Sequence, residues 1–242
     1  MSSTLGLPDL TAVILAGGLG TRLRTVAPNR QKVVAAVGAR PFVTRVLDQL
    51  AAAGLRRVVL CTGHHSEQVR AELGDQYGRL ALRYSLESQP LGTAGAARLA
   101  LSMVTGDPVL VMNGDSFCAA DLGAFLQWHQ ARRAAGSLLL TRVADVGRYG
   151  QVQVAADGAV ERFVEKSAMS GPGWISAGVY LLAHRVLEAI PTEQLVSIER
   201  AVFPAWVGKG LYGWPGGGRF IDIGTPASLA EAQGFFDRPG PE

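Results

Sequence analysis

The chain has little cysteine: Cys61 and Cys118 are the only two in 242 residues. Both lie in apolar, strand-like runs, and neither belongs to a CxxC pair, so the sequence holds no disulfide framework and no cysteine spacing typical of a metal site. Such usage fits a reducing compartment. The N-terminus lacks a basic leader segment, and no apolar run approaches the ~18 residues of a membrane span. These absences predict a cytoplasmic protein without a membrane partner.

Net charge is also small. The formal charge is +3 and charged residues make up 18% of the chain, which is too little and too dispersed for a nucleic-acid-binding surface. Hydrophobic residues make up 48%, which argues against disorder. The length suits one large α/β domain or two small ones. Because no linker or internal repeat occurs, we expect a single domain over 1–242 with its core at about 12–236.

Acidic residues are missing from the stretch 11–47, and this gap is the most informative one. The stretch contains no Asp or Glu but six cations: Arg22, Arg24, Arg30, Lys32, Arg40 and Arg45. Within it, the apolar run 12–15 leads into a glycine-rich segment, Leu15-Ala16-Gly17-Gly18-Leu19-Gly20-Thr21-Arg22-Leu23. Glycines let backbone N–H groups approach phosphate oxygens closely, and the turn's amides supply partial positive charge. We therefore expect a polyphosphate-binding loop.

Two better-known phosphate-binding motifs do not fit this loop. A Walker loop needs a Gly-Lys pair followed by Ser or Thr, which does not occur in this context. A dinucleotide-binding loop needs a third glycine where Leu23 stands, and an acidic residue further on for the ribose. A glycine turn without a ligand is the remaining alternative.

The hydrophobic pattern predicts alternating strands and helices in the first half. We expect strands at 12–16, 57–62 and 108–113, and helices at 42–53 and 93–104. Asp121 is predicted to cap a further helix. In the second half we expect strands at 137–144, 149–155, 159–165 and 174–182, helices at 184–190, 197–207 and 226–236, and a loop with a short strand within 208–218. The alternation predicts an α/β fold with a parallel sheet that binds ligands at the carboxyl ends of its strands.

The glycine-rich segment, with Lys32 ten residues after Arg22, resembles the signature of the sugar-phosphate nucleotidyltransferases. Further segments match that family in order: Gln89-Pro-Leu-Gly-Thr-Ala-Gly95, Met112-Asn-Gly-Asp-Ser116, Arg148-Tyr-Gly150, Glu165-Lys166, Ser176-Ala-Gly-Val-Tyr180, Ser197-Ile-Glu199 and Phe220-Ile-Asp-Ile-Gly-Thr-Pro226. Within the family, the match is best with D-glycero-D-manno-heptose 1-phosphate guanylyltransferases. The resemblance implies a Rossmann-like three-layer sandwich with a mostly parallel central sheet.

The resemblance also implies which residues bind the nucleotide. These are Leu15, Ala16, Gly17, Gly18, Gly20, Thr21, Arg22, Gln89, Gly92, Thr93, Asn113 and Gly114. Arg22, Lys32 and Asp115 would be catalytic. Arginine can grip phosphate oxygens bidentately, and lysine would neutralise charge that develops between two phosphates. A solvated surface lysine is the alternative for Lys32.

Mg²⁺ is the implied cofactor, with Asp115 and Asp222 as its ligands. Mg²⁺ prefers one or two carboxylates together with phosphates and water. Asp222 interrupts the apolar run 220–223, and a carboxylate in such a place is costly unless it meets a cation. The alternatives are a helix or turn cap for Asp115 and a buried salt bridge for Asp222.

The identity of the base stays open at this point. Gln89 stands where the family has a glutamate, and guanine offers two donors that suit a carboxylate, whereas glutamine suits uracil, thymine or cytosine better. Glu87 could take over if the loop shifts.

The sugar phosphate would contact Gly150, Glu165, Lys166, Ser176 and Gly178. Ser176 replaces the family's asparagine, and an exposed ion pair is the alternative for Glu165 and Lys166.

The function that the resemblance implies is transfer of a nucleoside monophosphate from an NTP to a sugar 1-phosphate with release of pyrophosphate, and the favoured substrates are GTP and D-glycero-D-manno-heptose 1-phosphate. The alternatives are a uridylyl-, thymidylyl- or cytidylyltransferase acting on a hexose or amino-sugar 1-phosphate, and a non-catalytic subunit that binds nucleotide sugars. A homodimer is a further expectation, because dimers are common in such enzymes.

Overall fold

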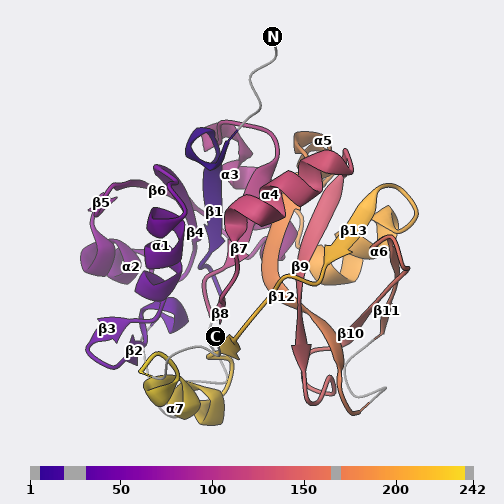
Figure 1. Ribbon diagram of the computed structural model, residues 1–242. Coiled ribbons are helices and arrows are strands. Elements are labelled where there is room, and N and C mark those ends of the chain that lie inside the picture. Colours follow the sequence, from indigo (N-terminus) through magenta and orange to yellow (C-terminus); the bar gives the residue numbers. More distant parts are fainter. Residues whose placement is uncertain (1–5, 19–30, 165–169, 238–242) are drawn as a thin grey trace.

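The computed structural model describes residues 6–18, 31–164 and 170–237 (Figure 1). Several predicted site residues lie outside these ranges, and their roles stay predictions: Gly20, Thr21, Arg22, Glu165 and Lys166.

A large sheet forms the centre of the described structure, with the strand order β13-β9-β12-β7-β1-β4-β6-β5. Its strands are β1 (Thr11–Leu15), β4 (Arg57–Thr62), β5 (Gln76–Tyr77), β6 (Leu80–Leu86), β7 (Val109–Asn113), β9 (Gly136–Val143), β12 (Gly173–Leu182) and β13 (Leu211–Trp214). β7, β1, β4 and β6 are parallel neighbours, and β13 is parallel to β9. β12 is antiparallel to both β7 and β9, and β5 is antiparallel to β6. Most strands therefore run the same way.

Helices cover both faces of this sheet and complete three layers (Figure 1). On one face lie α1 (Val43–Ala52), α2 (Ser66–Leu73) and α4 (Leu122–Ala131), whose apolar side chains share one core cluster. On the other face lie α3 (Gly92–Ala100) and α5 (His184–Glu188), which belong to a second cluster. The predicted three-layer α/β fold is confirmed.

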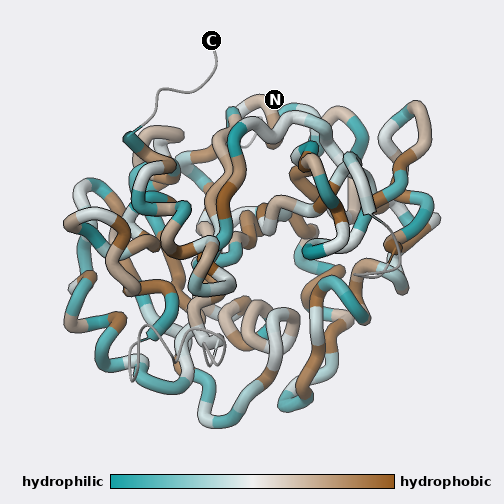
Figure 2. The backbone as a smooth tube through the Cα atoms, turned by 90° about the horizontal axis from the view of Figure 1, so that it is seen from below, coloured by the Kyte–Doolittle hydropathy of each residue, from teal (hydrophilic) through white to brown (hydrophobic). Residues whose placement is uncertain are grey.

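Strand β1 shows why two cores form. Ala12 and Ile14 belong to the first cluster and Val13 to the second, because successive side chains of a strand point to opposite faces. A strand buried on both faces reads as a continuous apolar run, as 12–15 does. Viewed from below, hydrophobic segments lie toward the interior and hydrophilic ones form much of the outer loops (Figure 2).

The topology reverses at β1. From β1 the chain adds β4 and then β6 on one side of the sheet, and later β7 on the other side. Such a switch point leaves a crevice beyond the carboxyl ends of the strands, where open α/β sheets bind their ligands. The segments that follow these four strands, 17–18, 63–64, 87–90 and 113–115, therefore converge on one place.

Small elements close the carboxyl edge of the sheet from below (Figure 1). They are the β8 (Ser116–Cys118) and β14 (Phe220–Asp222) pair, the β2 (Ala36–Val37) and β3 (Arg40–Pro41) pair, and α7 (Pro226–Phe235). A third apolar cluster that includes Phe42, Ile221 and Ile223 holds them together. Residues about a hundred positions apart are thereby fixed side by side.

A two-stranded antiparallel ribbon lies beside β12 and β13. It consists of β10 (Gln151–Val154) and β11 (Val160–Val164), paired antiparallel. A π-helical turn, Ile198–Val202, and α6 (Phe203–Trp206) replace the single helix predicted over 197–207. Short 3-10 turns complete the described elements at Leu7–Asp9, Lys32–Val34 and Leu101–Met103.

The remaining predicted strands and helices are confirmed to within a few residues. Asp121 caps α4 as predicted, accepting a hydrogen bond from the Ala124 N–H, and the short strand within 208–218 is β13. The sequence patterns missed α2, β5 and β6. α2 buries only Val69 and Leu73, too few apolar residues for a clear helical period.

None of the helices within the described ranges has the length and apolarity that crossing a membrane requires.

Candidate active site

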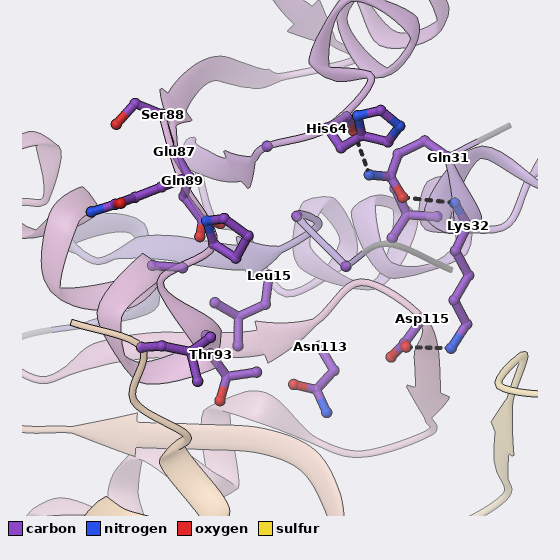
Figure 3. Close-up of a pocket in the computed structure, with 18 residues that line it drawn as sticks. Leu15, Gln31, Lys32, His64, Glu87, Ser88, Gln89, Thr93, Asn113 and Asp115 are labelled. Carbon is purple, nitrogen blue, oxygen red and sulfur yellow. Dashed lines mark hydrogen bonds and ion pairs between the residues drawn. The ribbon is translucent and has the colours of Figure 1, made fainter. Parts of the chain in front are cut away.

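A cavity of about 700 Å³ occupies the crevice at the carboxyl ends of the parallel strands (Figure 3). Most of the predicted nucleotide-binding and catalytic residues within the described ranges line it: Leu15, Gly17, Gly18, Lys32, Gln89, Gly92, Thr93, Asn113 and Asp115. They come from four separate segments of the chain. The tertiary structure thus gathers residues that the sequence had marked independently.

Two predicted nucleotide-binding residues, Ala16 and Gly114, do not line the cavity. Ala16 is buried, and its N–H donates to the Cys61 carbonyl, which continues the pairing of β1 with β4. The Gly114 N–H donates to the Leu15 carbonyl at 3.0 Å, and a Cβ at position 114 would lie 2.9 Å from that same oxygen. These residues shape the wall behind Leu15, and a larger side chain at 114 would push that wall inward.

Lys32 is held in place by its neighbour Gln31. The Gln31 side chain is buried, donates to the His64 carbonyl at 2.8 Å, and accepts from the Lys32 N–H at 2.8 Å. The backbone N–H of Gln31 donates to the side-chain oxygen of Gln68 on α2. Because these three hydrogen bonds fix the turn, the backbone that carries Lys32 has little freedom.

The Lys32 ammonium forms an ion pair with the Asp115 carboxylate, with Nζ 2.5 Å from Oδ2. The Lys32 side chain is 15% exposed and the Asp115 side chain 37%. The alternative of a solvated surface lysine is therefore wrong. Asp115 does not cap a helix either, and it keeps one carboxylate oxygen and considerable exposure toward the cavity.

Asp222 lies close to this pair but faces a different set of donors. It ends β14, opposite Ser116 in the β8–β14 pairing, so its backbone adjoins Asp115. A Cβ placed on Gly224 would lie 2.7 Å from Asp222 Oδ1 and 3.7 Å from Lys32 Nζ. The Asp222 carboxylate and the Lys32 ammonium therefore flank the same glycine.

Four donors hold the Asp222 carboxylate. Its Oδ1 accepts from the Gly224 N–H at 2.6 Å and the Ser228 hydroxyl at 3.2 Å. Its Oδ2 accepts from the Tyr149 hydroxyl at 2.6 Å and from Arg148 at 3.3 Å. Asp222 and Arg148 form a salt bridge, the alternative role considered for Asp222, but the Arg148 side chain is 49% exposed. Burial and the Asp222 charge raise the pKa of the Tyr149 phenol, which keeps it a donor.

Asp115 and Asp222 fit the ligand preferences of Mg²⁺. Both supply hard carboxylate oxygens, and one oxygen of Asp115 has no hydrogen-bond partner among the described residues. Each oxygen of a carboxylate has two lone pairs, and the four donors fill those of Asp222, so a metal ion there would replace one of them; the contact from Arg148, at 3.3 Å, is the longest. Nowhere in the described ranges do three or more His, Cys, Asp or Glu side chains form a metal cluster.

The opposite end of the cavity carries Glu87 and Gln89, which follow β6 (Figure 3). Gln89 is exposed, whereas Glu87 is half-buried. The Glu87 carboxylate accepts from the Leu91 N–H at 2.9 Å. Burial raises the pKa of Glu87, and the Leu91 hydrogen bond partly offsets this effect.

Gly92 requires glycine for two reasons. It starts α3 with φ +71°, a left-handed conformation, and a Cβ there would lie 2.5 Å from the Val196 carbonyl oxygen. This close approach ties the start of α3 to the loop 191–197, as does the bond from the Ile198 N–H to the Thr93 hydroxyl. The floor of the cavity at this end is therefore rigid backbone.

The predicted sugar-binding residues lie around a second, smaller cavity of about 100 Å³. Gly150 and Ser176 line it, together with Tyr149 and Glu199. The hydroxyl of the fully buried Tyr180 donates to the Glu199 carboxylate at 3.1 Å. The side chain of Ser197 caps the 198–202 turn. Gly178 lies elsewhere: it has φ +76°, and a Cβ there would be 2.6 Å from the Asn113 amide nitrogen. Gly178 thus lies between Asn113 of the large cavity and Ser176 of the small one, to whose hydroxyl its N–H donates.

A model of the "Nucleotidyl transferase" family matches residues 11–238. The chain belongs to this family. Among relatives, it is 36% identical over 222 residues to mannose-1-phosphate guanylyltransferase of Mycobacterium tuberculosis, covering 90% of this chain and 62% of that protein. It is 33% identical over 225 residues to D-glycero-alpha-D-manno-heptose 1-phosphate guanylyltransferase of Aneurinibacillus thermoaerophilus, covering 93% and 97%. The chain thus spans less than two thirds of the mannose relative.

Solved structures of the family have the same architecture. HddC from Yersinia pseudotuberculosis, 29% identical, superposes with a TM-score of 0.83 over 94% of this chain and 99% of its own, and has also been crystallised with GMP-PN. A putative glucose-1-phosphate thymidylyltransferase from Bacillus anthracis, 22% identical, shares the fold with a TM-score of 0.84 over 96% and 97%. The predicted family is confirmed.

Sequence reasoning missed three residues of this nucleotidyl transferase site. Gln31 positions Lys32, His64 lines the large cavity, and Tyr149 contacts Asp222. The sequence does offer one signal for Gln31: it is a polar residue directly next to the predicted catalytic lysine. Nothing in the sequence pairs Tyr149 with Asp222, because 73 positions separate them.

Proposed function

We propose that the chain transfers a nucleoside monophosphate from an NTP to a sugar 1-phosphate and releases pyrophosphate. GTP and D-glycero-D-manno-heptose 1-phosphate are the favoured pair. The observation that carries this proposal is the arrangement of the charged groups. The Lys32–Asp115 pair stands at one end of the large cavity, and Asp222 stands beside it, held by a residue of the small cavity.

In the proposed reaction, an oxygen of the sugar 1-phosphate attacks the α-phosphorus of the NTP. A P–O bond forms as the bond to pyrophosphate breaks, and the electron pair leaves with pyrophosphate. Both reactants are anions, so positioning and charge neutralisation dominate catalysis. Lys32 would neutralise charge between the phosphates, while the backbone at Gly17 and Gly18 would allow their close approach.

Asp115 and Asp222 would hold Mg²⁺ next to Lys32. The metal would supply further positive charge to the phosphates when bound. Asn113, which lines the large cavity and whose amide lies against Gly178, would orient a substrate hydroxyl or phosphate oxygen. Arg22 is proposed to grip the triphosphate, and Glu165 and Lys166 the sugar phosphate.

Two relatives bear on the identity of the sugar. The heptose relative supports a manno-heptose substrate and is matched over nearly its whole length. The mannose relative has slightly higher identity, so mannose 1-phosphate is the second candidate. The two sugars share the manno configuration of the ring and differ at its exocyclic end. Discrimination must therefore come from groups that contact that end.

Pyrophosphate release should be measured with GTP, UTP, dTTP, CTP and ATP against heptose, mannose and glucose 1-phosphates, with Mg²⁺ present. We expect turnover to be fastest with GTP and the manno-heptose. Absence of turnover with every pair would refute the enzyme assignment, and a faster rate with mannose 1-phosphate would refute the heptose assignment alone. A Lys32→Met variant is the control for background hydrolysis.

A further inference from the structure

His64 is a side chain of the large cavity that the proposed reaction does not use. It lines the cavity, and its ring nitrogens make no hydrogen bond with any described residue. Its backbone, in contrast, is held in a closed turn, because the Gly63 carbonyl accepts from the Ser66 N–H at 3.1 Å. An imidazole has one N–H donor when neutral and two when protonated. His64 therefore has donor capacity that a ligand in the cavity can use.

The ring of His64 is supported by His65. The two ring centroids lie 3.8 Å apart, and Nδ1 of His65 lies 3.4 Å from a carboxylate oxygen of Glu67. His65 has φ +59°, a left-handed conformation that a residue with a Cβ rarely adopts. Such strain persists only where the surrounding structure holds it, and it clusters at functional sites. The turn thus holds the His64 ring at the cavity despite a strained backbone.

His64 lies on the Lys32 side of the cavity (Figure 3). Its carbonyl oxygen accepts from the side chain of Gln31, which in turn accepts from the Lys32 N–H. On its other side the turn adjoins the loop after β1, since a Cβ on Gly63 would lie 3.6 Å from the Gly17 carbonyl oxygen. His64 is therefore next to the glycine loop and the lysine, the two groups proposed to contact the phosphates.

The strand order shows on which side of the reacting phosphate His64 lies. The small cavity, proposed for the sugar, adjoins β12, because Ser176 of that strand lines it. From β12 the order runs to β7, which precedes Asp115, then to β1, and then to β4, which precedes His64. Neighbouring strands lie about 4.8 Å apart, so the ends of β7 and β4 are about 10 Å apart. Along the sheet, the small cavity and His64 thus lie on opposite sides of Asp115.

This order sets the direction in which pyrophosphate leaves. In phosphoryl transfer the attacking and leaving oxygens lie roughly in line with the phosphorus. With the α-phosphorus beside the Lys32–Asp115 pair and the sugar oxygen arriving from the β12 side, pyrophosphate departs toward β4. Negative charge develops on this group as its bond to the α-phosphorus breaks, so a positioned N–H donor there stabilises the transition state.

We infer that His64 binds the pyrophosphate group of the NTP and steadies it as it leaves. The inference rests on the proposed function, since it supposes that the large cavity holds the NTP with its α-phosphorus near Lys32. His64 donates a ring N–H to an oxygen of the β- or γ-phosphate and keeps its proton, while the electron pair of the broken bond leaves with pyrophosphate. It contacts neither the nucleoside nor the sugar.

Two variants separate the ring of His64 from its nitrogens. His64→Phe keeps a planar ring against His65 and removes both nitrogens. His64→Gln removes the ring and keeps an N–H donor of similar reach. His184→Gln is the matched control, because His184 is half-buried and lines neither cavity, and an amide can still donate to the Gly106 carbonyl that its ring contacts.

Equilibrium binding of inorganic pyrophosphate, GTP and GMP should be measured with Mg²⁺ for the parent chain and the three variants, together with kcat/KM for GTP. We expect His64→Phe to weaken the binding of pyrophosphate and of GTP about 10- to 100-fold, the value of one hydrogen bond to a charged group. Binding of GMP, which lacks the leaving group, should change less than about twofold. His64→Gln and His184→Gln should keep all three dissociation constants within about threefold.

Unchanged binding of pyrophosphate by His64→Phe overturns the inference, as does an equal weakening of GMP. A folded His64→Gln that loses as much affinity as His64→Phe also overturns it, because the ring and not the N–H would then matter. Melting curves identify a variant that does not fold, and His64→Ala then replaces His64→Phe with the same expected result.

The binding constants require no turnover, so they test His64 separately from the proposed function. A parent chain that binds pyrophosphate but releases none with any substrate pair refutes the proposed function alone. A parent chain that binds neither pyrophosphate nor GTP overturns both.

Discussion

The two ends of the site are built by different parts of the fold. The large cavity, proposed for the nucleotide, lies where parallel strands finish, is about 700 Å³ in volume, and is lined by short loops and glycines. The small cavity, proposed for the sugar, lies between the antiparallel ribbon β10–β11, strand β12 and the 198–202 turn, and is about 100 Å³. Parallel strands converge on one edge, so the first end follows from strand order. The second depends on how separate elements pack.

Asp222 connects the two ends. One oxygen of its carboxylate is held by the start of α7, and the other by Tyr149 of the small cavity. A charge at the junction of two substrates can therefore respond to both. Substitutions that affect one end, the junction, or the other end should differ in which substrate's kinetic constants they change.

Lys32→Met should have the largest effect. It removes the cation that faces the phosphates and leaves Asp115 without its partner. We expect kcat to fall about 100- to 1,000-fold, as for other removed transition-state donors. Steady-state pyrophosphate release measures this effect. Lys209→Met, which removes an exposed lysine far from both cavities, is the matched control and should keep full activity. A loss below tenfold would exclude Lys32 from the charge-neutralising role.

Asp222→Asn should come next and should remove the response to the metal. The substitution keeps one oxygen for the Gly224 N–H, so the fold should persist while the charge is lost. We expect kcat to fall about 100-fold and the melting temperature to stop responding to Mg²⁺ added with GTP. Asp121→Asn removes a carboxylate at a helix cap that asparagine fills equally well, and serves as the control. Near-normal turnover and an unchanged Mg²⁺ response would remove Asp222 from the metal site.

Tyr149→Phe tests the contact between Asp222 and the small cavity. It removes a hydrogen bond of 2.6 Å to a carboxylate while keeping the ring against Phe220. We expect kcat/KM for the sugar 1-phosphate to fall about tenfold, because bonds to charged groups contribute about 1.5–3 kcal/mol, and KM for the NTP to change less than about twofold. Initial rates with each substrate varied in turn give both constants. Equal changes in the kinetic constants of the two substrates would contradict a specific effect of Tyr149 on the sugar 1-phosphate.

Ser176→Ala should have the smallest effect. The Ser176 hydroxyl makes only long contacts of 3.4 Å, to Tyr180 and to the Gly178 N–H, so the protein loses little. If the hydroxyl binds the sugar, kcat/KM for the sugar 1-phosphate should fall about two- to tenfold, the value of a neutral hydrogen bond. Urea unfolding should show the parent stability. An unchanged kcat/KM would take Ser176 out of the sugar site.

Most of the fold was predictable because its signals are local. The apolar runs of β1, β4 and β7 and the helical period of α1 identify these elements by their composition alone. α2 and β6 were missed because each lies near the edge of the sheet and buries few residues. The pairing of β8 with β14 was beyond reach, since each has three residues and about a hundred positions separate them.

The site was predictable only as a set of candidates. The order of motifs marked Lys32, Asp115 and Asp222, but their meeting depends on the β8–β14 pair and on Gly224 between them. Gln89 was marked by its motif, yet only the path of the chain after β6 shows that Glu87 also lines the cavity, and that it is half-buried where Gln89 is exposed. The roles predicted for Arg22, Glu165 and Lys166 lie outside the described residues and stay predictions.

The sequence by itself determined that β1 ends in a glycine loop free of acidic residues, because periodicity and composition are properties of neighbouring residues. It also determined the family, because the motifs recur in order along the chain. Only the tertiary structure decided which carboxylates lie near one another, which of them pairs with Lys32 and which side chains line the large cavity. Those contacts join segments distant in the chain, and their free energy comes from packing that no local pattern records.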